Sequence, residues 1–232
     1  MVATALVPAA GLGLRLGAGA PKALRLLAGE PLLLHTVRGL LAARAVSQVV
    51  VAMPPGSEDV VRGLLPPGVV VVAGGTTRGG SVRAALAASD PDRDVVVVHD
   101  AARPLTPPSL VDAVIGAVLD GAGAVVPALP VTDTVKRVDA AGRVLGTVDR
   151  AELRAVQTPQ GFRRAVLERA YAEAGAEAGA DSGATDDAGL VERLGLEVIT
   201  IPGADEAFKV TRPADLAFAE MLLAGRAVGR GA

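Results

Sequence analysis

The chain has 232 residues, of which 50% are hydrophobic and 21% charged, a length that suits one well-buried α/β domain. A formal net charge of −2 and an aromatic content of 2% argue against nucleic-acid binding, because they supply neither a basic surface nor stacking rings. The absence of cysteine excludes disulfides, thiolate nucleophiles and cysteine-bound zinc, and two histidines argue against a histidine-based metal site. We therefore expect a single domain over residues 1–232 without a metal site built by the protein alone.

The N-terminal segment is apolar and ends in small residues at positions 17–20, which superficially resembles a secretory signal. No Lys or Arg precedes this segment, and Pro8 and Arg15 interrupt it, so we do not expect export. No later stretch of about 18 uncharged apolar residues is present to cross a membrane. We therefore expect a cytoplasmic protein.

A glycine-rich loop follows the first expected strand. The strand covers residues 4–8 and the loop covers residues 9–17, with Arg15 inside the loop and Lys22 shortly after it. Glycine has no Cβ and adopts positive φ without strain, so such a loop lets backbone N–H groups approach an anion. The pattern predicts a phosphate or nucleotide site, with an ordinary turn between strand and helix as the alternative.

The spacing of this loop does not match two common nucleotide-binding motifs. A dinucleotide fingerprint needs glycine where Leu16 stands and an acidic residue after the second strand, but the strand at residues 48–53 has none at its end. A Walker A loop needs Lys followed by Ser or Thr, whereas Lys22 is followed by Ala23. The loop alone therefore does not identify the nucleotide.

Helices and strands alternate along the first half of the chain. The expected helices cover residues 31–45, 57–65 and 82–88, and the expected strands cover residues 48–53, 68–73 and 94–98, with a second glycine-rich connection at residues 74–81. This alternation predicts an α/β fold with a doubly wound, mostly parallel sheet.

Several polar residues follow the strand at residues 94–98. Ligands in open α/β sheets bind beyond the carboxyl ends of strands, so Asp100 and Arg103 are candidate site residues. We expect His99, which ends the buried strand, to be a hydrogen-bonded structural residue rather than a general base. Thr106 is expected to cap the next helix, with Pro107 as its first residue.

The second half of the chain contains a segment of short strands without intervening helices. After an expected strand at residues 124–131, residues 132–157 contain short strands at 135–138 and 144–148 around a turn at 139–142. A hairpin of this size is not stable alone, so we expect this arm to pack on a partner subunit. The remaining expected elements are a helix at residues 163–174, a helix capped near Thr185-Asp186-Asp187, a strand at residues 196–201 and a final helix opening at Thr211-Arg212-Pro213.

Eight groups of residues then occur in a specific order. They are Pro8-Ala9-Ala10-Gly11 with Arg15 and Pro21-Lys22; Gly74-Gly75 with Arg78 and Ser81-Val82; His99-Asp100-Ala101-Ala102-Arg103-Pro104; Asp133-Thr134 with Lys136; Thr147-Val148-Asp149-Arg150; Gln157-Thr158-Pro159-Gln160; Thr185-Asp186; and Lys209-Val210-Thr211-Arg212-Pro213. Together, over about residues 4–222, they resemble the 2-C-methyl-D-erythritol 4-phosphate cytidylyltransferase family. Any one group would be a weak signal, but eight in register are specific.

The resemblance implies a nucleotidyltransferase fold and an activity. The expected reaction transfers the cytidylyl group of CTP to 2-C-methyl-D-erythritol 4-phosphate, releasing pyrophosphate, in non-mevalonate isoprenoid synthesis. The resemblance also implies Mg²⁺ bound mainly through the CTP phosphates and a homodimer whose arms complete each other's sites. The alternatives are a cytidylyltransferase for ribitol 5-phosphate or another sugar phosphate, and a non-catalytic nucleotide-binding module, against which Arg15, Lys22 and Lys209 together argue.

The resemblance assigns roles to residues by position. Arg15 and Lys22 would stabilise the transition state. The CTP site would contain Ala9, Ala10, Gly11, Gly75, Ser81, Asp100 and Ala101, and the acceptor site would contain Arg103, Thr134, Arg150, Thr158, Thr185 and Lys209. Thr76, Gly80 and Ala23 depart from the family's usual residues, which a backbone-mediated readout of cytosine would tolerate.

The chemistry agrees with the residue types present. Attack of one phosphate on another gathers negative charge, so it needs fixed positive charge and Mg²⁺ rather than a covalent nucleophile. Of the 23 basic residues only three are lysine, and Lys22, Lys136 and Lys209 each lie inside one of the eight groups. A compact ammonium and a guanidinium are not interchangeable at a phosphate, which favours a specific use for these lysines, although Lys136 is equally consistent with an exposed arm charge.

Overall fold

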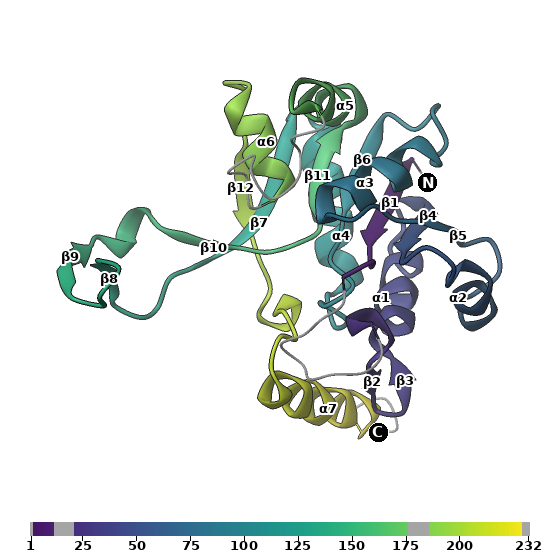
Figure 1. Ribbon diagram of the computed structural model, residues 1–232, viewed down its shortest axis with the longest axis horizontal. Helices are drawn as coiled ribbons and strands as arrows, with labels where there is room; N and C mark the ends of the chain where they lie inside the picture. Colours follow the sequence, from purple (N-terminus) through teal and green to yellow (C-terminus); the bar gives the residue numbers. More distant parts are fainter. Residues whose placement is uncertain (1, 12–20, 176–185, 229–232) are drawn as a thin grey trace.

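The computed structural model describes residues 2–11, 21–175 and 186–228, and the structural statements below concern these residues. Eight strands form the central sheet (Figure 1): β1 (Ala3–Pro8), β4 (Val46–Met53), β5 (Val70–Ala73), β6 (Val95–Val98), β7 (Ala124–Pro130), β10 (Arg154–Val156), β11 (Gln160–Arg163) and β12 (Ile199–Pro202). Their order is β10-β7-β11-β6-β1-β4-β5, and β12 pairs with β7 beside this path.

Most strand pairs of this sheet are parallel. β1 pairs in parallel with β4 and β6, β4 with β5, and β12 with β7. β11 runs antiparallel between β6 and β7, and β10 runs antiparallel to β7. The predicted doubly wound, mostly parallel sheet is confirmed, but the strand β11 was not predicted.

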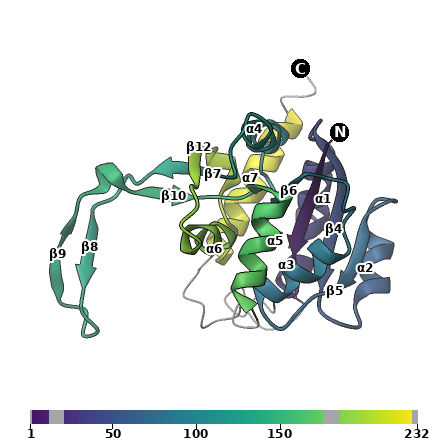
Figure 2. The ribbon, with the colours of Figure 1, turned by 90° about the horizontal axis from the view of Figure 1, so that it is seen from above.

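Helices cover both faces of the sheet. They are α1 (Leu32–Leu41), α2 (Glu58–Leu64), α3 (Arg78–Ala87), α4 (Pro108–Leu119), α5 (Arg164–Glu173), α6 (Asp187–Arg193) and α7 (Pro213–Val228). Successive side chains of β1 point to opposite faces of the sheet. Ala5 and Val7 therefore lie in the core beneath α1 and α4, whereas Leu6 lies in the core beneath α3 and α5. Figure 2 shows α4 and α5 on opposite sides of the strands.

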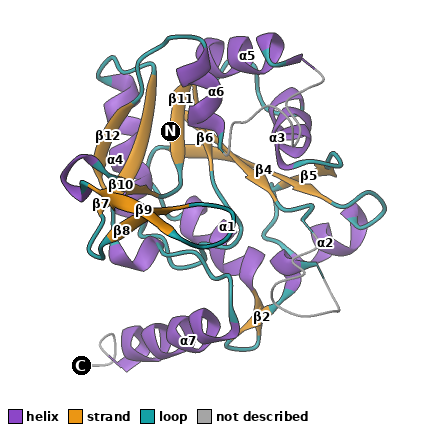
Figure 3. Ribbon diagram, turned by 60° about the vertical axis from the view of Figure 1, so that its left-hand side comes forward, coloured by secondary structure: helices purple, strands orange, loops and turns teal. Residues whose placement is uncertain are grey.

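The final helix packs apart from the main sheet. It lies beside a small hairpin, β2 (Leu26–Leu27) and β3 (Glu30–Pro31), which the sequence did not predict (Figure 3). Leu27 and Ala219 belong to the separate apolar cluster that joins the two. No described helix is long and apolar enough to cross a bilayer.

Two helix starts differ from the predictions. α3 begins at Arg78, four residues earlier than expected, because the Thr77 hydroxyl accepts from the Gly80 N–H, 2.9 Å away, and caps the helix there. α4 begins at Pro108 with Pro107 as its N-cap residue, so Thr106 does not cap it. The Thr106 hydroxyl instead donates to the carbonyl of Arg103 at 3.1 Å.

The predicted arm projects from the body of the molecule (Figures 1 and 2). Its strands β8 (Val135–Val138) and β9 (Val144–Val148) pair with each other in a separate two-stranded sheet, at the predicted bounds. Val138, Val144 and Leu145 on this hairpin are more than half exposed, at 51%, 61% and 63%. The arm therefore presents apolar side chains that the described part of the chain leaves exposed.

Candidate active site

A cavity of about 290 Å³ opens at the carboxyl ends of β1, β5 and β6. The chain passes from β1 to β4 on one side and later returns to β6 on the other, so the cavity lies where the strand order reverses. The described lining comes from five segments: Pro8 to Gly11, Lys22 and Ala23, Gly75 to Arg78 with Ser81, Asp100 to Ala102, and Lys209.

Backbone forms two walls of this pocket. On one wall Ala9 is buried and donates its N–H to the carbonyl of Ala52 at 2.8 Å, which ties the loop after β1 to β4. On the other wall the Ser81 hydroxyl contacts the carbonyls of Gly75 and Thr77 at 3.3 and 3.0 Å. These contacts anchor Ala9 and Gly75 beside the cavity.

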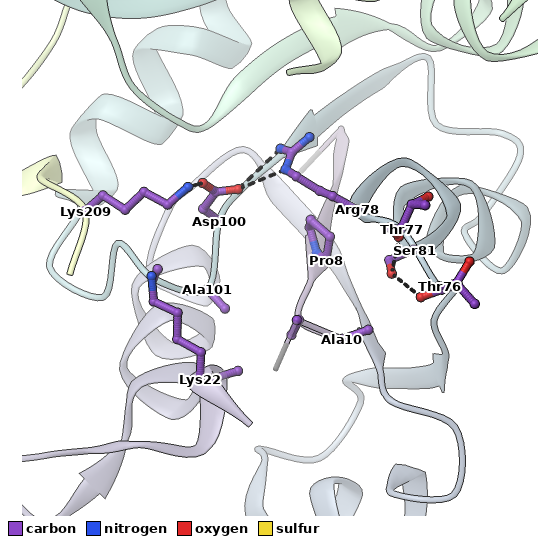
Figure 4. A pocket seen from close by; sticks show the side chains of 15 residues that line it. Pro8, Ala10, Lys22, Thr76, Thr77, Arg78, Ser81, Asp100, Ala101 and Lys209 are labelled. Atoms are coloured by element: carbon purple, nitrogen blue, oxygen red, sulfur yellow. Dashed lines mark hydrogen bonds and ion pairs between the residues drawn. The ribbon is translucent and has the colours of Figure 1, made fainter. Parts of the chain in front are cut away.

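Asp100 links the two sides of the pocket (Figure 4). Its Oδ2 accepts from Lys209 Nζ at 2.6 Å, and its Oδ1 accepts from Arg78 Nε and Nη2, each at 3.3 Å. Burial would raise the pKa of Asp100, but the cations of Arg78 and Lys209 outweigh it and hold that pKa well below its ordinary value. The carboxylate is therefore ionised throughout the neutral range.

Arg78 also reaches away from the pocket into the core. Its Nη1 donates to Asp187 Oδ2 at 2.7 Å, and the hydroxyl of Tyr171 donates to Asp187 Oδ1. Burial alone would lower the pKa of Arg78, but the Asp187 and Asp100 carboxylates raise it above its ordinary value. Arg78 is thus a fixed cation shared between two carboxylates.

His99 and Thr158 lie behind Asp100. The Asp100 N–H donates to Thr158 Oγ1 at 3.1 Å, and the Thr158 hydroxyl lies 3.0 Å from His99 Nδ1. Burial lowers the pKa of His99 to about 4, so the ring is neutral, and its Nε2 faces the carbonyl of Arg103 at 3.3 Å. His99 is hydrogen-bonded and buried, as its position at the end of a buried strand predicted.

Lys22 enters the pocket from the opposite side to Arg78. It begins the 3₁₀ turn Lys22–Leu24, and Figure 4 shows its side chain extending toward Ala101, Asp100 and Lys209. Arg15, the expected partner of Lys22, lies outside the described residues. Among the described residues, no group of three or more His, Cys, Asp or Glu could hold a metal ion.

Comparisons with known proteins decide the family. The family model for 2-C-methyl-D-erythritol 4-phosphate cytidylyltransferase matches residues 3–225. The chain belongs to this family. A curated cytidylyltransferase of this name from Frankia casuarinae is 63% identical over 220 residues, covering 95% of this chain and 80% of the relative. The one from Streptomyces coelicolor is 53% identical over 240 residues, covering 98% of this chain and 87% of the relative.

Solved structures of cytidylyltransferases agree. The crystal structure of the Thermus thermophilus 2-C-methyl-D-erythritol 4-phosphate cytidylyltransferase matches with a TM-score of 0.77 at 40% identity, covering 96% of this chain and 98% of that one. The 4-diphosphocytidyl-2C-methyl-D-erythritol synthase of Anaerococcus prevotii matches with a TM-score of 0.80 at 27% identity and the same two coverages. The predicted nucleotidyltransferase fold is therefore confirmed over nearly the whole chain.

The pocket of this cytidylyltransferase gathers all seven residues expected to bind CTP. Its lining includes Ala9, Ala10, Gly11, Gly75, Ser81, Asp100 and Ala101, together with Lys22 and Lys209. Thr76, one of the departures from the family's usual residues, also lines it, whereas Gly80 packs behind Gly75. Segments far apart in the sequence thus meet at one pocket, and their binding of CTP stays a prediction.

The expected acceptor residues are more scattered. Thr134 and Arg150 belong to the arm, are exposed and do not line the pocket, and Arg150 donates to the carbonyl of Thr132. Arg103 does not line the cavity and donates to the carbonyls of Ala207 and Val156 at 2.5 and 3.4 Å. Thr158 is buried behind Asp100, and Thr185 lies outside the described residues.

Three residues that the structure connects to the site have no functional role predicted from the sequence. Arg78 lies in one of the eight groups, and Asp187 lies where the sequence predicts only a helix cap. Tyr171 lies in none of the groups. One signal was available, because Tyr171 is the only tyrosine of the chain, but nothing in the sequence pairs it with Asp187.

Proposed function

We propose that this chain transfers the cytidylyl group of CTP to the phosphate of 2-C-methyl-D-erythritol 4-phosphate, releasing pyrophosphate. The observation that carries the proposal is the pocket at the reversal of strand order, where backbone at residues 9–11 and 75–78 faces Lys22, Lys209 and Asp100. These two stretches of backbone suit a small planar base read by backbone groups. No aromatic residue is among the described lining of the pocket, so a purine gains no stacking partner there.

In the proposed reaction an oxygen of the acceptor phosphate attacks the α-phosphorus of CTP. A new P–O bond forms, and the bond from the α-phosphorus to the oxygen that bridges to the β-phosphate breaks, so pyrophosphate leaves. Lys22, with Arg15, stabilises the negative charge that develops around the α-phosphorus. No covalent enzyme intermediate is needed, which fits the absence of cysteine and the structural role of His99.

The residues present fit a metal carried by the nucleotide. Asp100 is the one carboxylate among the described lining residues, and it is already paired with Arg78 and Lys209. Mg²⁺ is commonly held by one or two carboxylates together with substrate phosphates. We therefore propose that the CTP phosphates hold Mg²⁺ with at most Asp100 in reach, and that the bound ion neutralises phosphate charge.

We also propose that the chain forms one domain with a dimerisation arm at residues 132–157, in a homodimer with shared active sites. The exposed apolar residues Val138, Val144 and Leu145 support the dimer, because a two-stranded hairpin gains stability only by packing on something else. In this arrangement Thr134 and Arg150 bind the acceptor in the partner's pocket. We also propose that the reaction takes place in the cytoplasm.

The experiment that tests this function measures initial rates of pyrophosphate release from CTP with 2-C-methyl-D-erythritol 4-phosphate as acceptor. The proposal predicts release that depends on both substrates. Release with ribitol 5-phosphate alone would identify the rival cytidylyltransferase. No release with any polyol phosphate would favour a non-catalytic nucleotide-binding module.

A further inference from the structure

We propose that Asp187 and Tyr171 are positioning residues for the nucleotide, because they hold Arg78 where it fixes the carboxylate of Asp100. This inference rests on the proposed function in one respect, that Asp100 meets the sugar of CTP. Neither Asp187 nor Tyr171 is among the residues that line the pocket. They act through Arg78.

Five side chains from five segments form a continuous row, which we call the ionic row. It consists of Tyr171 on α5, Asp187 on α6, Arg78 on α3, Asp100 after β6 and Lys209 after the 3₁₀ turn Asp205–Ala207. Each of the two carboxylates accepts from a different partner on each of its oxygens. Figure 4 shows the part of the row that faces the pocket, from Arg78 through Asp100 to Lys209.

The row runs from the core to the pocket. The side chain of Asp187 is 0% exposed, that of Asp100 is 12%, and those of Arg78 and Lys209 are 33% and 40%. A fully buried carboxylate persists only when its charge is paired and its oxygens are hydrogen-bonded, and Arg78 and Tyr171 supply both to Asp187. Asp187 is therefore the fixed end of the row.

Fixing Arg78 at two edges determines where it points. Nη1 of the planar guanidinium faces Asp187, while Nε and Nη2 face Asp100, so the group is not free to swing into the cavity. Along the row, the positive charges of Arg78 and Lys209 balance the negative charges of the two carboxylates. Arg78 therefore orients Asp100 rather than adding net positive charge at the phosphates.

An oriented Asp100 suits recognition of a sugar. Each carboxylate oxygen has two acceptor positions; Arg78 donates twice to Oδ1 of Asp100, and Lys209 donates once to Oδ2. The position that remains, on Oδ2, accepts from a hydroxyl group in a fixed geometry. Loosening Arg78 should therefore weaken the distinction between CTP and analogues that lack a ribose hydroxyl.

The test uses Tyr171→Phe and Asp187→Asn in the full chain. Tyr171→Phe removes one hydroxyl, and Asp187→Asn keeps the side-chain shape but removes its charge. We expect the KM and the calorimetric Kd for CTP to rise about tenfold in Asp187→Asn and less in Tyr171→Phe, as for loss of a charged hydrogen bond. The preference for CTP over 2′-deoxy-CTP or 3′-deoxy-CTP should fall by a similar factor, with kcat and the acceptor KM changed less than twofold.

Ser89→Ala provides the matched control. Ser89 is a buried residue just beyond the other end of α3, and its hydroxyl accepts from Arg164 at 2.9 Å. Ser89→Ala should lower the free energy of unfolding by about as much as Tyr171→Phe. Its KM for CTP and its preference for CTP over the deoxy analogues should stay at the wild-type values. Asp187→Asn combined with Asp100→Asn should bind CTP no more weakly than Asp100→Asn alone, because both act on one interaction.

The inference is overturned if the Asp187 and Tyr171 variants lose stability but keep wild-type binding and discrimination of CTP. Binding of CTP is measured without turnover, so failure of this inference can be distinguished from failure of the proposed function. If wild type binds CTP and the variants bind it more weakly, the ionic row has the stated role even if no polyol phosphate is cytidylylated. If wild type releases pyrophosphate and the variants match it in every constant, the function stands and the inference fails. If Asp187→Asn does not fold, Tyr171→Phe decides.

Discussion

A Cβ on Gly75 would lie 2.8 Å from both the Cα and the carbonyl carbon of Gly80, so these two glycines meet backbone to backbone. The contact presses the turn after β5 onto the first turn of α3, beside the pocket. Both partners are main chain, which leaves no flexible side chain to move aside. The shape of one pocket wall therefore depends on the absence of a side chain at Gly75.

Gly75→Ala should displace that wall. We expect the free energy of unfolding to fall by about 1–3 kcal/mol, as for other overpacked sites, and the KM for CTP to rise. Gly116→Ala on α4 is the control, because a Cβ there meets nothing within 4 Å. That variant should be more stable by roughly 0.5–1 kcal/mol, with unchanged kinetics. Equal unfolding curves and KM values for Gly75→Ala and wild type would contradict the close contact.

Lys22→Ala should lower kcat by roughly 10²-fold or more while the melting temperature barely changes. Removing one fixed charge from a developing anion typically costs about 3–4 kcal/mol of transition-state stabilisation. Arg62→Ala serves as the control, since Arg62 is an exposed cation on α2 paired with Asp59. Near wild-type turnover by Lys22→Ala would show that the lysine has no catalytic role.

His99 should make the stability depend on pH. The folded state holds its pKa at about 4, below the ordinary 6.5, so below about pH 6.5 the unfolded chain binds a proton that the folded chain does not. Stability contributed by the neutral ring is present above that pH and is lost as the pH falls. Between pH 7 and pH 5 we expect a loss of about 2 kcal/mol, from linkage of these two pKa values.

Urea unfolding followed by circular dichroism at the two pH values measures this loss. His99→Asn retains a polar group near Thr158 without a titrating ring. Its free energy of unfolding should therefore fall less than that of wild type between pH 7 and pH 5, by about the contribution assigned to His99. A variant and wild type with the same dependence on pH would mean that folding does not lower the pKa of His99. The lowered pKa of Asp100 contributes little in this window, because its ordinary value of 3.8 is already below it.

The sequence predicted those elements whose local pattern matches their final environment. Strands such as β6, four consecutive valines, are recognisable as buried, and the β8–β9 hairpin is recognisable from its turn at residues 139–142. β11 was missed because Gln160–Arg163 contains one apolar side chain, and only its pairing with β6 and β7 makes it a strand. The start of α3 was missed because Gly79 and Gly80 are poor helix formers, and the Thr77 cap overrides them.

The sequence predicts individual segments of the pocket, but not the contacts between them. The glycine-rich turns, Lys22 and Asp100 each have a local signal, and the family resemblance joins them. The pair formed by Lys209 and Asp100 spans 109 residues, as does the pair formed by Arg78 and Asp187. No local pattern encodes such pairs, because they depend on how the sheet brings its strand ends together.

The arm supplies a test of the shared active site. If Arg150 binds the acceptor phosphate in the partner's pocket, Arg150→Ala should raise the KM for the polyol phosphate far more than the KM for CTP. Mixing Arg150→Ala with Lys22→Ala should then restore up to about a quarter of wild-type activity. Half of the dimers would be mixed, and one of the two pockets in each would carry neither defect. Subunit exchange without recovered activity would place Arg150 in its own chain's site.

The most direct measurement of the central claim is a competition between two acceptors in one reaction. The protein is given limiting CTP with equal concentrations of 2-C-methyl-D-erythritol 4-phosphate and ribitol 5-phosphate, and the two cytidylylated products are quantified by mass spectrometry. Their ratio equals the ratio of the two kcat/KM values. We predict that 4-diphosphocytidyl-2-C-methyl-D-erythritol exceeds the ribitol product by about 100-fold or more, as for sites that hydrogen-bond one substrate and leave polar groups unpaired with another. An equal mixture, or an excess of the ribitol product, would contradict the proposed function.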